Sequence, residues 1–124
     1  MGCAALFVFG CAQNKVIEPS PLRVKPVTSS LASAGEFRDI AVDDLNGDGH
    51  LDIVGGATSP GMVTINYGDG HGGISETQTL PVNGDVQSVA VADLNEDGLN
   101  DIVFSVQRAS MGIRIWLNQS KRKW

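Results

Sequence analysis

The chain has 124 residues, a formal net charge of -5 and 19% charged residues. This length suits one small domain, which buries about 60 to 70% of its surface on folding. The negative charge leaves no basic footprint for a phosphate backbone, so we expect no nucleic acid partner. A hydrophobic fraction of 42% together with 15 glycines favours strands and tight turns over helices.

The first eleven residues form an apolar run that is typical of a signal peptide. A membrane-spanning helix needs about 20 residues, so this run is too short to be one. Residues 8–11 (VFGC) resemble the lipobox of bacterial lipoproteins, which implies that Cys11 is lipidated. A buried first strand with Cys11 in the core and myristoylation at Gly2, where Leu6 fits the motif poorly, are the alternatives.

The lipobox resemblance implies a location at the bacterial cell envelope, at the outer membrane or cell surface, or secretion. We expect membrane contact only through this N-terminal anchor. Residues 12–26 contain Pro19, Pro21 and Pro26 and have the composition of a tether. Residues 121–124 form a short basic tail that we expect to be solvated. Both cysteines lie in the first eleven residues, so no disulfide can link parts of the fold.

The rest of the chain is an internal repeat. Residues 40–54 align with residues 89–103 without a gap, with ten of fifteen positions identical and a period of 49 residues. After one inserted residue, residues 113–117 are also similar to residues 63–67. We divide the chain into repeats at 27–74 and 75–120, each with about four short apolar segments. Their β-branched residues and alternating pattern predict strands.

Four strands in a repeat of this length are typical of a propeller blade. We therefore expect an all-β fold of two four-stranded, blade-like units that form a partial β-propeller. Two blades do not close a ring, so their open edges favour self-association.

An acidic loop occurs once in each repeat, as D-x-N-x-D-G-x-x-D at residues 44–52 and 93–101. Its three carboxylates would repel one another unless a cation neutralised them. Calcium suits the loop because it accepts six to eight oxygen ligands in irregular geometry, whereas magnesium demands an octahedral shell. We expect the side chains at positions one, three, five and nine, with the carbonyl at position seven, to be the ligands. These residues are Asp44, Asn46, Asp48, His50 and Asp52, then Asp93, Asn95, Asp97, Leu99 and Asp101.

An EF-hand loop also begins in this way, but it ends on an acidic residue at position twelve and lies between helices. Here the twelfth position is Gly55 or Phe104, and the flanking segments are strand-like. The loops instead resemble the FG-GAP/VCBS repeat of integrin α-subunit propellers and bacterial surface proteins. Gly55-Gly56-Ala57 resembles that family's Gly-Ala element, from which the second copy departs. The resemblance implies a calcium-bound β-propeller blade.

No residues outside the loops suggest catalysis. Residues 68–73 match G-x-G-x-x-G, yet they stand between two strand patterns and predict a hairpin connection. Tyr67 and Trp116 lie in alternating segments and are expected in the core rather than on a sugar platform. We expect no enzyme but a calcium-binding module that binds an extracellular protein or glycan or acts structurally. The alternative is a fragment or remnant of a larger surface protein or secreted enzyme with such repeats.

Overall fold

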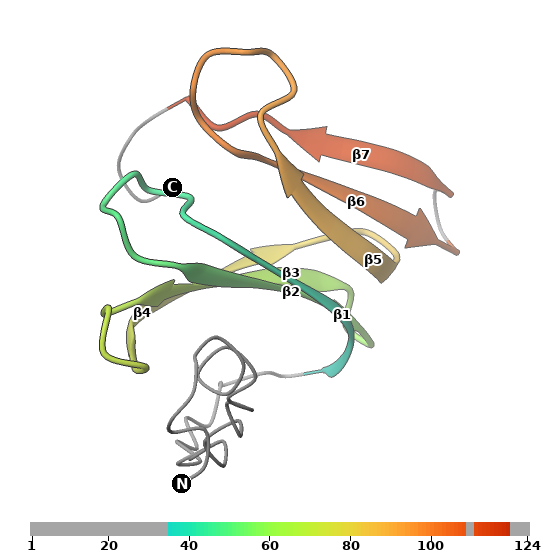
Figure 1. The fold of residues 1–124 in the computed structure, drawn as a ribbon. Helices are drawn as coiled ribbons and strands as arrows, with labels where there is room; N and C mark the ends of the chain where they lie inside the picture. The colour runs from blue at the N-terminus through green and yellow to red at the C-terminus, as the bar shows by residue number, and fades with distance from the viewer. Residues whose placement is uncertain (1–34, 109–110, 120–124) are drawn as a thin grey trace, which may run out of the picture.

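The computed structural model describes residues 35–108 and 111–119, and every regular element in that part of the chain is a strand (Figure 1). No helix in these residues is long and apolar enough to cross a membrane. The expectations for the signal run with Cys11, the tether and the basic tail concern residues outside the described ranges. The strands are β1 (Glu36–Asp43), β2 (Asp52–Thr58), β3 (Met62–Gly68), β4 (Ile74–Pro81), β5 (Asp85–Ala92), β6 (Asp101–Gln107) and β7 (Gly112–Trp116).

The strands form two antiparallel sheets, with the orders β1-β2-β3-β4 and β5-β6-β7. The expected all-β class is confirmed. The second sheet, however, contains three strands in the described residues instead of the predicted four. The predicted division between residues 74 and 75 falls at the start of β4, which pairs with β3 in the first sheet. A repeat alignment gives the period but not the pairing, and short connections make consecutive strands pair.

The internal repeat is visible in the strand register. A bulge interrupts the β1–β2 pairing between Phe37 and Asp39, and another interrupts the β5–β6 pairing between Val86 and Ser88, 49 residues later. Between the second and third strands, Ile53 pairs with Asn66 in the first sheet and Ile102 pairs with Trp116 in the second sheet. The first three strands of each sheet therefore have equivalent registers.

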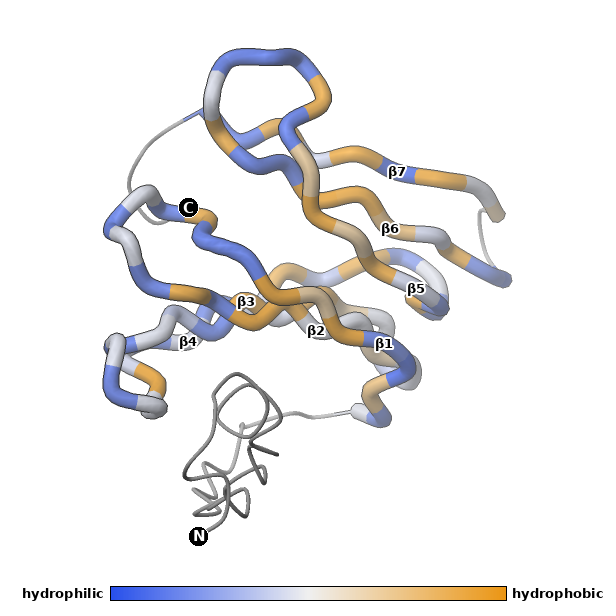
Figure 2. Tube along the Cα trace, in the orientation of Figure 1, coloured by the Kyte–Doolittle hydropathy of each residue, from blue (hydrophilic) through white to orange (hydrophobic). Residues whose placement is uncertain are grey.

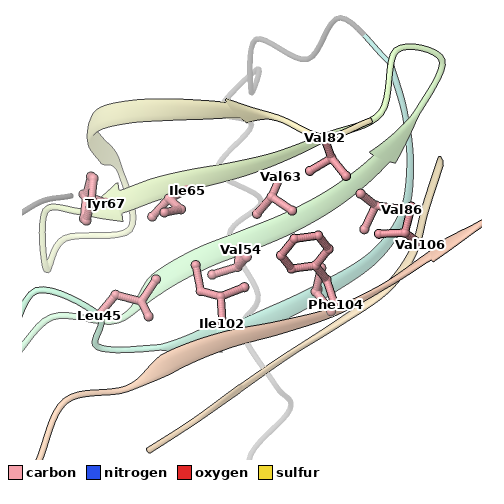
Figure 3. Close-up of a cluster of buried hydrophobic side chains, with 11 residues drawn as sticks. Leu45, Val54, Val63, Ile65, Tyr67, Val82, Val86, Ile102, Phe104 and Val106 are labelled. Carbon is pink, nitrogen blue, oxygen red and sulfur yellow. The ribbon is translucent and has the colours of Figure 1, made fainter. Parts of the chain in front are cut away.

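The two sheets pack against each other with β5 lying beside β1 and β2. Side chains from both sheets meet in one hydrophobic cluster (Figure 3). Tyr67 is fully buried there, and Trp116 packs edge-on against Phe104 with ring centroids 4.5 Å apart. Both aromatic residues thus belong to the core, as the sequence predicts. The cluster consists of Leu45, Val54, Val63, Ile65, Tyr67, Val82, Val86, Val89, Ile102, Phe104 and Val106.

Two adjacent glycines in β2 allow close packing on opposite faces of the first sheet. A Cβ at Gly56 would lie 2.6 Å from Cγ1 of Val86 in the second sheet, and a Cβ at Gly55 would meet the Phe37 ring. Such distances are shorter than any ordinary carbon contact. The Gly-Gly pair therefore permits the close approach of β5 on one face and of Phe37 on the other.

We expect Gly56→Ala to lower the free energy of unfolding by about 1 to 3 kcal/mol, because the added methyl group overpacks the contact between the sheets. Urea denaturation measures this loss. Ser105 occupies the equivalent position on the exposed face of the second sheet, so Ser105→Ala serves as the matched control. We expect that control to cost less than about 1 kcal/mol. Equal costs for the two variants would contradict this account of Gly56.

Candidate metal centre

The two acidic loops occupy equivalent places, each joining the first and second strands of its sheet (Figure 1). Gly49 and Gly98 both have φ of 87°, in the left-handed region that glycine adopts without strain. An L-residue in this left-handed region costs about 1 to 2 kcal/mol, which explains glycine at the point where each loop reverses.

In the first loop, backbone N–H groups fold the chain around the carboxylates. The Asp44 carboxylate accepts hydrogen bonds from the N–H groups of Gly47, Asp48 and Gly49, at 2.7, 3.3 and 2.8 Å. The Asn46 side chain accepts from the Asp48 N–H at 3.1 Å and donates to Asp48 Oδ2 at 3.0 Å. Asp48 Oδ1 accepts from the His50 N–H at 2.8 Å. These bonds fix the side chains at positions one, three and five against the backbone of the loop.

The second loop repeats this arrangement. Asp93 accepts from the N–H groups of Asp97 and Gly98, at 3.2 and 2.8 Å. The Asn95 side chain accepts from the Asp97 N–H and donates to Asp97 Oδ2, and Asp97 Oδ1 accepts from the Leu99 N–H. The main difference is at position four, where Glu96 adopts a φ of 60° in place of glycine. Two separate sequences therefore fold into the same carboxylate-centred loop.

The carboxylates at position nine differ from the others because they are buried. Asp52 and Asp101 each have 0% exposure. Asp52 accepts from the N–H of Leu45 at 2.8 Å and of Gly68 at 3.0 Å. Asp101 accepts from the N–H of Leu94 at 2.9 Å and of Asn118 at 2.8 Å. Each of these aspartates thus links its loop to the end of the third strand of its sheet.

Two carboxylates in the first loop have displaced pKa values of opposite sign. Hydrogen bonding from the His50 N–H lowers the pKa of Asp48. Burial raises the pKa of Asp52, and repulsion from the charges of Asp48 and Asp44 adds to this effect, although the Leu45 and Gly68 N–H groups oppose it. The ionised form of Asp52 is therefore destabilised in the absence of a cation.

The oxygen donors of each loop fit a hard divalent cation. Among residues 35–108 and 111–119, no three Asp, Glu, His or Cys side chains already converge as a metal site. The four predicted side-chain donors of each loop nevertheless all supply oxygen, and three of them are carboxylates. A carboxylate oxygen that accepts one N–H retains a second lone pair. Asp44 Oδ1 accepts two N–H groups, but Asp44 Oδ2 and both oxygens of Asp52 accept one each and so keep capacity for a cation. This oxygen-rich set suits calcium.

Two asparagines of the second repeat support the first loop, although no local sequence pattern indicates them. Nδ2 of Asn118 donates to the Leu45 carbonyl at 2.7 Å and to the Asn100 carbonyl at 3.2 Å, and Asn118 is 1% exposed. Nδ2 of Asn100 donates to the Asp44 carbonyl at 3.3 Å. Asn118 lies one residue beyond the aligned segments, at the position equivalent to Gly68, so only an extension of the repeat alignment could have drawn attention to it.

Residues 68–73 form the predicted hairpin connection. Asp69 accepts from the N–H groups of His71 and Gly73, and its own N–H donates to the Gly73 carbonyl.

At the end of the sheets opposite the acidic loops lies a polar cavity of about 650 Å³ lined partly by the Asp85–Arg108 ion pair at 2.9 Å. No sequence pattern indicates this cavity, because its residues come from separate strand ends.

The fold and loops define an all-β repeat protein with two equivalent acidic loops. Residues 44–104 match the family model described as an FG-GAP-like repeat. This range starts at the first aspartate of the first loop and ends in β6, so it includes both loops. The chain therefore contains an FG-GAP-like repeat, which confirms that part of the predicted resemblance. No curated protein and no solved structure matches the chain.

The raised pKa of Asp52 predicts a pH dependence of stability in calcium-free buffer. A carboxyl group with a raised folded-state pKa holds its proton more tightly in the folded chain, so stability falls as the pH rises from the ordinary value of 3.8 through the folded-state value. We expect the unmodified chain to lose stability relative to Asp52→Asn over this window. Urea denaturation at pH 4 and pH 7 measures the difference, and a change of the opposite sign would refute the assignment.

We expect Asn118→Ala to lower the free energy of unfolding by about 1 to 3 kcal/mol, because it leaves the buried Leu45 carbonyl without this donor. The adjacent Gln119 is exposed, so Gln119→Ala is the matched control and should change stability by less than about 0.5 kcal/mol. Chemical denaturation of both variants decides the matter. A loss for Gln119→Ala as large as that for Asn118→Ala would show that the hydrogen bonds are unimportant.

Proposed function

We propose that this protein is a calcium-binding module of the bacterial cell envelope, in which calcium stabilises the two acidic loops. The observation that carries the proposal is the same hydrogen-bonded arrangement of Asp, Asn and Asp side chains in both loops. Two loops whose sequences differ at positions four, seven and eight keep this arrangement. Both loops therefore offer the same set of oxygen donors to a cation.

The proposed ligands are the side chains at positions one, three, five and nine and the carbonyl at position seven. Asp44, Asn46 and Asp48 are already held together by backbone N–H groups, and Asp93, Asn95 and Asp97 are their equivalents. Calcium would supply two positive charges that offset most of the charge of the three carboxylates of each loop. FG-GAP-like repeats typically bind calcium, which supports this choice of metal.

Calcium binding would add to folding stability in this proposal. The buried carboxylate of Asp52 is destabilised by burial and by the neighbouring charges, and a bound cation would relieve both effects. Extracellular calcium modules have dissociation constants of roughly 10⁻⁴ to 10⁻³ M. The loops would therefore fill outside the cell and stay empty at cytosolic calcium concentrations.

The remaining parts of the proposal concern place and partner. The apolar run and the lipobox-like residues before Cys11 support anchoring at the envelope or secretion. An extracellular protein or glycan is the proposed partner, and no nucleic acid is proposed because the net charge is -5. We propose a binding or structural role without catalysis, since the sequence shows no grouping of acid, base and nucleophile residues other than the two metal loops.

We expect millimolar calcium to raise the melting temperature of the protein above its value in chelator, because the cation binds the folded state in preference to the unfolded one. Asp48→Ala and Asp97→Ala should each remove roughly half of this rise, since each disables one of two sites. Thermal unfolding followed by circular dichroism measures the effect.

Glu96→Ala is the matched control, because it removes a carboxylate from the same second loop without removing a proposed ligand. Glu96 is exposed, and no hydrogen bond joins its carboxylate to Asp93, Asn95 or Asp97. The calcium-dependent rise should therefore survive this change. An identical rise in all three variants, or no rise in the unmodified chain, would contradict the proposed metal sites.

A further inference from the structure

Hydrophobic side chains remain exposed on both sheets. Those of Ile113, Ile115, Leu117 and Leu94 belong to the second repeat, and those of Ile40 and Val42 belong to the first. Figure 2 shows hydrophobic residues along β7, the strand of the second sheet that lies farthest from the first sheet. Contiguous exposed apolar surface commonly marks an interaction site.

The two sheets pack against each other through unlike faces. We call the face of the first sheet that carries Ala41, Val54, Val63 and Ile65 its front face, and the opposite face, with Ile40, Val42 and Ile53, its back face. The equivalent front face of the second sheet carries Ala90, Val103, Ile113 and Ile115, and its back face carries Val89, Val91 and Ile102. In the core, the front face of the first sheet packs on the back face of the second.

The exposed residues of the second front face are the repeat equivalents of buried residues in the first. Val63 and Ile65 are both 0% exposed, whereas their equivalents Ile113 and Ile115 are 75% and 52% exposed. Leu45 in the first loop is buried in the core, and its equivalent Leu94 is exposed. The second front face therefore has the apolar composition of a packed face but lacks a covering sheet among the described residues.

The back face of the first sheet shows the converse. Val89 of the second sheet is 8% exposed and packs in the core, whereas its equivalent Ile40 is 59% exposed. Val91 packs against the same core, and its equivalent Val42 is half exposed. This back face therefore presents side chains equivalent to those that already pack on a front face inside the chain.

We propose that the protein associates with a second copy of itself head to tail, the front face of the second sheet of one copy packing on the back face of the first sheet of the next. Each copy carries both halves of this contact, and the packing between its own two sheets provides the template. Such a heterologous contact forms a closed ring if the rotation between copies closes, and an open chain of copies if it does not.

The contact between copies differs from the internal one in two places. At the position of Gly56 the second front face carries Ser105, and at the position of Val86 the back face of the first sheet carries Phe37, so the two sheets lie farther apart there than inside the chain.

The hydrogen bonds at the loop end differ as well. Asn100 and Asn118 donate to carbonyls of the first loop within the chain, but their equivalents in the first repeat are Leu51 and Gly68. The contact between copies therefore lacks these amide hydrogen bonds, and the exposed Leu51 side chain lies in their place. The association is thus more apolar than the packing inside the chain.

The test uses the full chain in millimolar calcium, with mass measured by light scattering and sedimentation over a concentration series. We expect masses that are multiples of 13.1 kDa and rise with concentration. Ile115→Arg on the front face and Ile40→Arg on the back face should each weaken association at least about tenfold, because either change places an unpaired charge in an apolar contact. Asn83→Arg, in the exposed connection between the sheets, is the control and should associate normally.

Mixing the two defective variants tests the head-to-tail geometry directly. Ile115→Arg retains an intact back face and Ile40→Arg an intact front face, so an equimolar mixture should form dimers that neither variant forms alone. Ile113→Lys is a second front-face variant that should behave as Ile115→Arg does. Melting curves of every variant establish that it is folded.

The proposal is overturned if the unmodified chain stays monomeric throughout the series, which would leave these faces to a further repeat or another protein. It is also overturned if Ile40→Arg associates as well as the unmodified chain, since the back face would then play no part. Failure of this proposal is distinguished from failure of calcium binding, because calcium binding is read separately from the melting temperature with and without chelator.

Discussion

A buried carboxylate at the end of each acidic loop connects the loop to its sheet. Asp52 joins the N–H of Leu45 in the loop to the N–H of Gly68 at the end of β3, and Asp101 makes the equivalent connection to Leu94 and Asn118. Because each carboxylate satisfies two backbone N–H groups inside the protein, the loop and the third strand are held together by one charged group. Any change in the charge of the loop therefore affects the sheet as well.

The packing between the sheets places different demands on the two repeats. The front face of the first sheet is covered by the second sheet. It therefore requires a glycine at position 56, beside Val86, and it buries Tyr67 completely. The same face of the second sheet carries Ser105 and Leu117 at those positions, and Leu117 is exposed. The first loop also receives hydrogen bonds from Asn100 and Asn118. Equivalent sequences thus have different surroundings in the two repeats.

These features divide the molecule into regions with separate proposed roles. Calcium would bind at the end where the strand pairs β1–β2 and β5–β6 are joined by the acidic loops, while contact between copies would use the faces of the sheets. The loops flank these faces, since Leu45 packs in the core and its equivalent Leu94 lies exposed beside the second front face. Calcium that orders the second loop would then also position one residue of the contact between copies.

The sequence by itself determined the all-β class and the period of 49 residues, because alternation and repetition can be read from the chain without knowing what packs where. It also identified the aspartates and asparagines of both loops, since their spacing is carried by short segments. Only the tertiary structure decided that β4 completes the first sheet, that Asp52 and Asp101 are buried, and that Asn118 supports the first loop. Those facts depend on contacts between residues far apart in the chain, and a local pattern contains no information about which distant segments will pack together.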